Sequence, residues 1–390
     1  MATLDHLRYL VETIGPRGST TPKEAEAAVY AARILQAAGL EPKTEQFISA
    51  RSAWYPYALF SAILLVAEGL LWTADRWRLA PWIAAGLGLA ALISVLLELA
   101  FRPNLLRWVL PKGRSQNAWA YIAPQGEVRR KVVISGHLDT HRTPLVFSSE
   151  RWVRFFSRLV PIGLAASVLL IVLFLLEGLW PTALWKPLSL PFALTLLTIF
   201  AITLQADLTP YTVGANDNAS GAALVLSTAE WLAQHRLQHT AVWAVLTGCE
   251  EVACYGAEDF ARRHQHELGP EAIWLTVDSV AGTQASPAYL TDETFLLTVR
   301  SDPQLLQIAE QVAARHPEWD AHSFSFRGAY TEGAVAAKYG FRVLTITGHR
   351  RDGVLPEWHR PTDDLAHLDT NALQHSEAFF RQVLLELDRQ

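Results

Sequence analysis

Four long apolar stretches dominate the hydrophobic pattern of the chain. They run from Trp54 to Ala74, Leu79 to Phe101, Leu159 to Trp180 and Pro187 to Ala206. Each holds about 20 residues, the length that a helix needs to cross a hydrocarbon layer of about 30 Å. None has Lys or Arg in its interior, and Trp and Tyr gather at their ends, as at membrane interfaces. Because helices of a soluble core seldom stay apolar on every face for this length, the pattern predicts four transmembrane helices.

The apolar stretches form two pairs with short connections, so the polar parts of the chain are predicted to share one side of a bilayer. The connections carry only Arg76, Arg78 and Lys186. Basic residues are more numerous on the other side, where those near the stretches are Arg51, Arg102, Arg107, Lys112, Arg114, Arg151, Arg154 and Arg158. The positive-inside rule therefore predicts a protein of the cell membrane whose polar part is cytoplasmic.

Three of the apolar stretches contain a single acid, namely Glu68, Glu98 and Glu177. Carboxylates within a membrane are often functional, but acids near the ends of a segment also reach the headgroups. A transport path would need polar faces that these segments mostly lack. Gly86 and Gly88 permit close helix packing, so a homo-oligomer through the membrane helices is one expected partner, beside the lipid bilayer.

The rest of the chain alternates between short apolar runs and helical patterns. Strands are predicted at 131–135, 240–246, 273–277 and 343–346, and helices at 24–40, 222–233, 257–264, 303–316 and 373–387. Thr21 before Pro22 is a typical start for the first helix. This alternation favours an α/β three-layer sandwich with a mostly parallel central sheet, into which the four transmembrane helices are inserted as two hairpins.

The predicted division of the chain follows from these elements. Residues 1–50 begin an α/β domain, 54–101 form the first hairpin, 102–150 continue the domain, 155–206 form the second hairpin, and 207–390 complete the domain. A net charge of −5 gives no basic face for nucleic acid. The two cysteines, Cys249 and Cys254, are too few for a disulfide scaffold and are expected to be small buried residues.

Imidazoles and carboxylates follow the predicted strands. The candidates are His137, Asp139, Asp217 within the glycine-rich segment 214–221, Glu250, Glu251, Asp278 and His359. Ligands of parallel sheets bind beyond the carboxyl ends of the strands, and this mixture of donors suits zinc. Each motif alone is weak, but their order and their places at strand ends together predict a metal site.

The residue types also suggest roles within this site. Five ligands are enough for two metal ions if one carboxylate bridges them, and Asp217 on its glycine-rich turn is the natural bridge. Asp139 is suited to accept the second ring N–H of His137, which would fix the tautomer of that imidazole. Of the neighbours Glu250 and Glu251, one can bind metal while the other acts as a base.

These motif blocks, together with Ile14-Gly15-Pro16-Arg17 and the segment from Asn117 to Asp139, resemble peptidase family M28, the di-zinc aminopeptidases of the aminopeptidase Y and leucyl aminopeptidase type. The resemblance covers nearly all residues outside the apolar stretches. It implies a peptide substrate, two Zn²⁺ per chain and Glu250 as the general base. It further implies that Asp217 bridges the metals, with His137 and Asp278 completing one site and Glu251 and His359 the other.

The chain also departs from the family pattern. The segment between Asp139 and Gly214 is expanded to hold the second hairpin, and His141-Arg142 stand where small residues are commoner. Trp358 stands where some relatives have Tyr. Tyr330 and Glu332 fall where relatives often line the substrate pocket, so these three residues are candidates for substrate contact.

Two alternative functions remain open. A glutaminyl cyclase on this fold would use one zinc, and a non-catalytic receptor or scaffold would be expected to lack some of the five ligands. The motifs do not separate aminopeptidase from carboxypeptidase or dipeptidase activity, because pocket-lining residues determine specificity.

Overall fold

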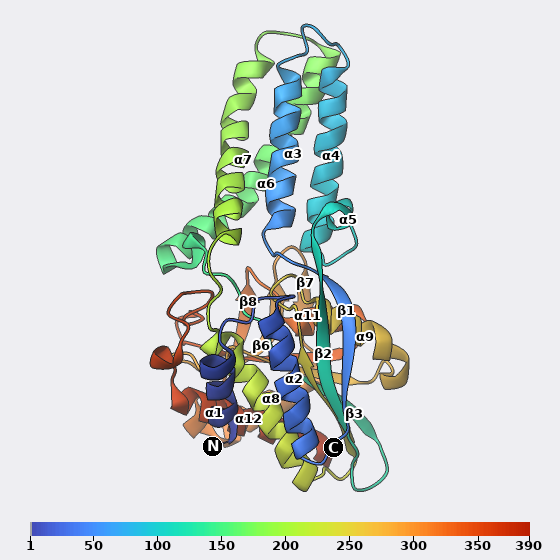
Figure 1. The fold of residues 1–390 in the computed structure, drawn as a ribbon, viewed down its shortest axis with the longest axis vertical. Helices are drawn as coiled ribbons and strands as arrows, with labels where there is room; N and C mark the ends of the chain where they lie inside the picture. The colour runs from blue at the N-terminus through green and yellow to red at the C-terminus, as the bar shows by residue number, and fades with distance from the viewer. Residues whose placement is uncertain (1) are drawn as a thin grey trace. The chain divides into compact units, whose positions relative to one another are not determined.

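The computed structural model describes residues 2–390, which form two compact units (Figure 1). The α/β unit comprises residues up to 51 together with 112–142 and 211–390, and the helical unit comprises 52–111 and 143–210. Residues 102–111 and 143–150, grouped with the α/β part on sequence grounds, lie in the helical unit. Residues 102–111 belong to the helical unit because they include α5 (Leu105–Val109). This helix buries Leu106 in the helical core and pairs Arg107 with Glu98 at 2.7 Å.

One nine-stranded sheet forms the centre of the α/β unit, in the order β1-β2-β4-β3-β5-β9-β6-β7 with β8 paired to β6. The strands are β1 (Pro42–Ala50), β2 (Lys112–Ile122), β3 (Arg130–His137), β4 (Thr240–Thr247), β5 (Ile273–Asp278), β6 (Ser286–Thr294), β7 (Thr298–Arg300), β8 (His322–Arg327) and β9 (Arg342–His349). The central strands β4, β3, β5 and β9 are parallel. Strands β1, β2, β6 and β7 join through antiparallel pairings.

The sheet is therefore mixed, and the expectation of a mostly parallel sheet is wrong. The hydrophobic pattern found the central strands because they are buried on both faces, as in β4, where every residue is buried. It missed β1 because exposed polar residues interrupt that strand.

Helices cover both faces of this sheet, as the alternation along β5 shows. Leu275 belongs to the core formed with α1 (Ala2–Arg8), α2 (Pro22–Ala37), α8 (Gly221–Gln234), α10 (Pro303–Arg315) and α12 (Thr370–Arg389). The preceding Trp274 packs on Phe260 of α9 (Tyr255–Leu268) with ring centroids 5.8 Å apart, and α11 (Glu332–Lys338) lies next to α9. Thr21 caps α2 by accepting from the Glu24 amide at 3.3 Å, as its sequence predicts.

Short turns complete the connections, and one of them is important for function. These turns are η1 (Tyr9–Ile14), η2 (Leu145–Phe147), η3 (Ala215–Ser220), η4 (Pro317–Trp319) and η5 (Leu365–His367). Segment η3 leads directly into α8 and has non-helical backbone angles at Asp217 and Asn218.

The helical unit contains α3 (Tyr55–Leu71), α4 (Ala80–Leu99), α6 (Glu150–Leu179) and α7 (Trp185–Asp207). Helix α3 packs on α4 and α7, and α6 packs on the same two helices (Figure 1). Within residues 2–390, three helices, α4, α6 and α7, are long and apolar enough to cross a membrane. Helix α3 is apolar but has 17 residues, fewer than the predicted stretch from Trp54 to Ala74.

The helical unit buries small polar side chains beside its apolar core and also exposes large apolar ones. Ser61, Ser167 and Ser189 are fully buried, whereas Val66 and Leu194 are 63% and 64% exposed. Gly88 lies at a close contact with α6, because a Cβ there would come within 2.8 Å of Ile171. Small residues thus allow these helices to approach one another closely.

Candidate metal centre

Parallel strands bring the predicted polar residues to one edge of the sheet. His137 is the last residue of β3 and Asp278 the last of β5. Glu250 and Glu251 follow β4, whose Thr247 pairs with His137. Since β4, β3 and β5 are neighbours and run in the same direction, these side chains start from adjacent carboxyl ends.

The Asp217 carboxylate lies between two imidazoles. Its Oδ1 is 3.3 Å from Nε2 of His137, and its Oδ2 is 3.3 Å from Nε2 of His359. Nε2 of His137 also lies 3.6 Å from Oδ1 of Asp278, and Nε2 of His359 lies 3.2 Å from Oε2 of Glu251. The other four residues predicted as metal ligands therefore gather around the Asp217 carboxylate.

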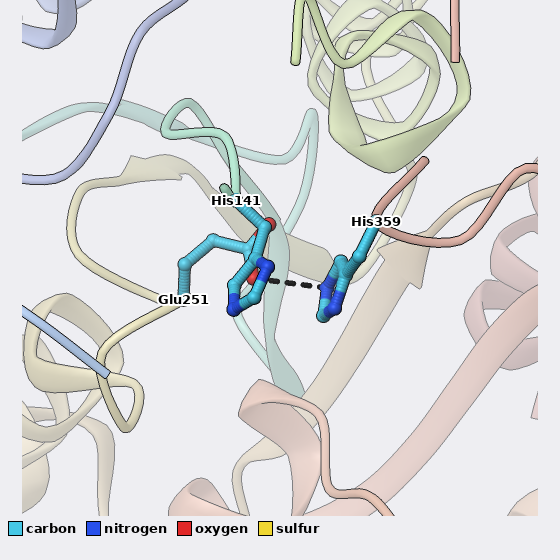
Figure 2. A group of neighbouring side chains, drawn as sticks. All are labelled: His141, Glu251 and His359. Carbon is cyan, nitrogen blue, oxygen red and sulfur yellow. Dashed lines mark ion pairs between the residues drawn. The ribbon is translucent and has the colours of Figure 1, made fainter. Parts of the chain in front are cut away.

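Three groups of side chains in this region bring ligand atoms within 4.8 Å of one another. They are His137 with Asp217 and Asp278, His137 with Glu250 and Glu251, and His141 with Glu251 and His359, the last of which Figure 2 shows. Among the described residues, Nε2 of His137 and Oε1 of Glu251 are buried without a hydrogen bond of good geometry. Because buried polar atoms are normally paired, and because imidazole and carboxylate are zinc ligands, these residues fit a zinc centre.

Glycines and one carboxylate hold Asp217 in place. Gly214 has φ of 59°, and a Cβ there would lie 2.3 Å from the Asp217 carbonyl oxygen. A Cβ on Gly221 would lie 2.4 Å from the carbonyl oxygen of Val277 in β5, so both positions require glycine. The Asp363 carboxylate accepts from the amides of Asn216 at 2.6 Å and Asp217 at 3.0 Å. The loop after His359 thus fixes the backbone of the central carboxylate.

Asp139 contacts the site in two ways. Nδ1 of His137 lies 3.1 Å from the backbone carbonyl of Asp139 and 3.5 Å from its carboxylate, so the carbonyl is the closer acceptor for the ring N–H. The carboxylate accepts from the amides of Glu250 at 3.0 Å and Glu251 at 3.2 Å, and from Ser19 Oγ at 2.6 Å. Asp139 therefore orients the Glu250-Glu251 segment as well as His137.

Arg17 is a buried residue for which the sequence indicated no role beyond its motif. Its guanidinium donates to the carbonyls of Leu10 and Gly15 at 2.9 Å, of Leu138 at 2.9 Å and of Val213 at 2.8 Å. It thereby ties the loop of His137 to the loop of Asp217. The signal was present in the segment Ile14-Gly15-Pro16-Arg17, but its burial depends on residues far along the chain.

The cysteines and the helix α2 also support the loop after β4. Within residues 2–390 both cysteines are buried free thiols, as expected. Beyond that expectation, Glu24 accepts from the Cys249 amide at 2.8 Å, and the Cys254 thiol donates to Oε1 of Glu250 at 3.2 Å. Burial raises the pKa of Glu24 to about 8.

The site concentrates negative charge in a buried space. Burial raises the pKa of Glu251 to about 7 and that of Glu250 well above its ordinary value. Burial opposes ionisation of Asp217 as well, but the two imidazoles hold its pKa far below the ordinary value. Burial alone would lower the pKa of His359, yet the carboxylates of Glu251 and Asp217 raise it to about 10. Such a cluster favours a bound cation.

The three candidates for substrate contact have different surroundings. Trp358 lies beside His359, with ring centroids 4.8 Å apart. Glu332 is buried, accepts from Ser135 Oγ at 2.8 Å and also bonds Thr247, so it lies beneath the carboxyl ends of β3 and β4. The Tyr330 hydroxyl bonds the backbone of Leu297, just before β7.

The central parallel strands, the helices on both faces of the sheet and the cluster of carboxylates and imidazoles define a zinc metallopeptidase fold. Solved structures with this fold include a zinc aminopeptidase from Bacillus subtilis, 13% identical with a TM-score of 0.59, whose alignment covers 99% of this chain and 94% of that one. An aminopeptidase from Aneurinibacillus sp. strain AM-1 is 13% identical, with a TM-score of 0.58 and coverage of 99% and 93%. A glutaminyl cyclase from Porphyromonas gingivalis is 14% identical, with a TM-score of 0.58 and coverage of 99% and 97%.

The family model of peptidase family M28 matches residues 201–384, which include four of the five predicted ligands. This match confirms, over residues 201–384, the resemblance to peptidase family M28 seen in the motifs. The chain is a zinc metallopeptidase. A search of curated protein sequences gives no significant match.

Proposed function

We propose that this protein is a membrane-anchored aminopeptidase that uses two zinc ions to remove N-terminal residues from peptides. The position of Asp217 is the observation that carries the proposal. Each of its carboxylate oxygens faces a different imidazole at 3.3 Å, which is the arrangement expected of a carboxylate shared between two metal ions. The aminopeptidases among the structural neighbours support the direction of cleavage.

The remaining ligands divide between the two metal positions. His137 and Asp278 would complete one position, and Glu251 and His359 the other, since each pair lies within 3.6 Å and on its own side of Asp217. Bound zinc would polarise the scissile carbonyl and lower the pKa of the attacking water.

Glu250 is proposed to act as the general base. It stands next to Glu251 but has its Oε2 3.9 Å from Nε2 of His137, so it borders both metal positions. It accepts the proton of the attacking water and returns it to the leaving amine, while the Cys254 thiol and the carboxylate of Asp139 hold its side chain and backbone. Trp358, beside His359, is proposed to contact the substrate, with Glu332 and Tyr330 as further candidates.

Replacing Glu250 tests this role. Glu250→Gln is expected to keep its zinc and to lower kcat by about 10²–10⁴-fold, the usual contribution of general acid–base catalysis. Glu258→Gln, on the outer part of α9, is the matched control and should hydrolyse peptides at the wild-type rate. Wild-type turnover by Glu250→Gln would show that another group is the base.

The direction of cleavage is tested with substrates that have free or blocked N-termini, with and without a chelator. Hydrolysis of free N-termini alone, abolished by the chelator, is the expected result. Because glutaminyl cyclases also share the fold, the panel includes a peptide with N-terminal glutamine. Ring closure with release of ammonia, and one zinc per chain, would favour a cyclase instead.

The helical unit is proposed to anchor the protein in the cell membrane. Helices α4, α6 and α7 are long enough to span it. We propose that α3 also crosses the membrane and pairs with α4 in the first hairpin. The exposed apolar and buried polar side chains of this unit support the proposal. The excess of basic residues outside the connections supports a cytoplasmic α/β unit. Reporter fusions near Arg76 and Trp185 test this orientation, and cytoplasmic signals there would reverse it.

A further inference from the structure

The first part of helix α6 is longer than a membrane crossing requires. The helix has 30 residues and is therefore about 45 Å long, whereas the hydrocarbon layer of a bilayer is about 30 Å thick. Its apolar part begins at Leu159, so the polar segment 150–158 extends beyond the length that spans the layer. In Figure 1 this first part of α6 projects sideways from the helix bundle.

A proline separates segment 150–158 from the spanning part of the helix. Pro161 lies inside α6 and has no N–H to donate to the Ser157 carbonyl one turn earlier. Helices bend at such positions, because the proline ring also clashes with that carbonyl. A bend here allows the segment to lie along the surface of a bilayer while the rest of α6 crosses it.

Three arginines share one side of this segment. Arg151, Arg154 and Arg158 are all exposed. At about 100° per residue they fall within about 60° of the helix surface. Among the described residues, no acid pairs with any of them. The guanidinium groups therefore form a basic stripe, and a guanidinium can donate two parallel hydrogen bonds to the oxygens of a phosphate.

Aromatic side chains accompany the basic stripe. Phe156 packs inward on the buried Trp54, with ring centroids 5.9 Å apart, and so holds this part of α6 against the helical unit. Trp152 and Phe155 lie on the outer side, 38% and 43% exposed, and contact each other edge to face at 5.5 Å. Exposed aromatic rings beside basic side chains are typical of helices that lie at a membrane interface.

We propose that segment 150–158 of α6 binds the headgroups of anionic phospholipids. The inference rests on the proposed membrane anchoring of the helical unit. Arg151, Arg154 and Arg158 would contact the headgroup phosphates, while Trp152 and Phe155 would lie among the headgroups and the adjoining acyl chains. An anionic lipid is preferred because the headgroup of a zwitterionic lipid brings its own cation, which repels the three guanidinium groups.

Lipid binding by the full chain in non-ionic detergent tests the proposal. The delipidated protein is titrated with phosphatidylglycerol or phosphatidylcholine, and the bound lipid molecules are counted by native mass spectrometry. Wild type is expected to bind the first phosphatidylglycerol at least about 5-fold more tightly, since each juxtamembrane Arg contributes about that factor toward an anionic surface. The variant Arg151→Gln/Arg154→Gln/Arg158→Gln should bind the two lipids equally.

A matched control separates this segment from positive charge in general. Arg76→Gln/Arg78→Gln removes two exposed arginines from the connection between α3 and α4, and it should keep the preference of wild type. Because the replaced arginines are exposed and glutamine is a good helix former, both variants should unfold at the wild-type temperature. Arg154→Gln alone should lose part of the preference and serves if the triple variant does not fold.

The outcomes separate the inference from the anchoring beneath it. Equal binding of both lipids by wild type, or an unchanged preference in the triple variant, overturns the role of segment 150–158 and leaves the membrane anchoring intact. Membranes that contain the full chain are also washed with alkaline carbonate, which removes proteins that do not span the bilayer. Retention of the chain is expected, and its release would overturn both the anchoring and the inference.

Discussion

Both units of this protein bury carboxylates, but they use them differently. In the helical unit each acid stands alone with local donors. Glu68 accepts from Ser189 Oγ at 2.6 Å and Trp72 Nε1 at 2.8 Å, and Glu98 accepts from Asn104 at 2.6 Å and Arg107 at 2.7 Å.

Glu177, the third of these acids, accepts from the Thr182 amide at 3.2 Å. In the α/β unit, by contrast, carboxylates from three segments meet the imidazoles of His137 and His359 around Asp217. The comparison shows that a buried acid is not by itself evidence of a functional site. Convergence from separate elements is the better sign, because a cluster of like charges is too unfavourable to keep without a cation.

The largest effect should come from the centre of the cluster. Asp217→Asn removes the shared carboxylate charge and is expected to lower kcat/KM by at least about 100-fold, since residues that only orient metal ligands already contribute 10–100-fold. The measurement is peptide hydrolysis together with zinc content. Glu98→Gln is the corresponding variant in the helical unit, and it should keep both the wild-type rate of peptide hydrolysis and the wild-type zinc content. Equal losses in the two variants would remove the distinction between the units.

Arg17 tests whether the site depends on a buried scaffold. Arg17→Met leaves the carbonyls of Leu10, Leu138 and Val213 without their donor, and removes a cation from a space next to Asp363 and Asp139. We expect a loss of roughly 3–5 kcal/mol in the free energy of unfolding, as for other broken buried charge networks. Thermal and denaturant unfolding followed by Trp fluorescence measure it. A change below about 1 kcal/mol, the scale of an exposed ion pair, would contradict the scaffold role.

Glu293 adds a pH dependence confined to the α/β unit. Burial raises its pKa from 4.5 to about 7, against hydrogen bonds from Thr331 and Thr345. The folded state therefore holds this proton more tightly than the unfolded state. The resulting stabilisation is complete below pH 4.5 and is lost as the pH rises to about 7, by roughly 3 kcal/mol at most.

Comparing wild type with Glu293→Gln isolates this contribution from other titrating groups. The variant should gain stability relative to wild type as the pH rises from 5 to 8, because Gln cannot ionise. Unfolding free energies at several pH values measure the difference. A difference that does not change with pH would show that Glu293 titrates alike in the folded and unfolded states.

The smallest effect should come from the helical unit. Glu68→Gln keeps an acceptor for Ser189 and Trp72, so we expect stability within about 1 kcal/mol of wild type and unchanged peptide hydrolysis. Thermal unfolding in detergent and the peptidase assay are the measurements. A large loss of activity would mean that the membrane acids take part in function, and the contrast between the units would fail.

Several parts of the fold could be predicted from the sequence because they depend on neighbouring residues along the chain. The apolar stretches, the fully buried strands β3, β4, β5 and β9, and the start of α2 at Thr21 each leave a local pattern of burial or capping. The motif residues likewise identified the five side chains that meet at Asp217. The outer strand β1 was missed because a strand rich in exposed polar residues has a weak hydrophobic pattern.

The tertiary structure alone decided which segments became neighbours. The amino-acid sequence of β1 or β6 does not specify its partner, since strand order follows from packing over the whole sheet. The burial of Arg17, the bond from the Glu250 amide to the Asp139 carboxylate and the stacking of His141 on His359 each join loops that are far apart in the chain. The sequence thus determined which groups were available for metal chemistry, and long-range packing determined which of them share one buried space.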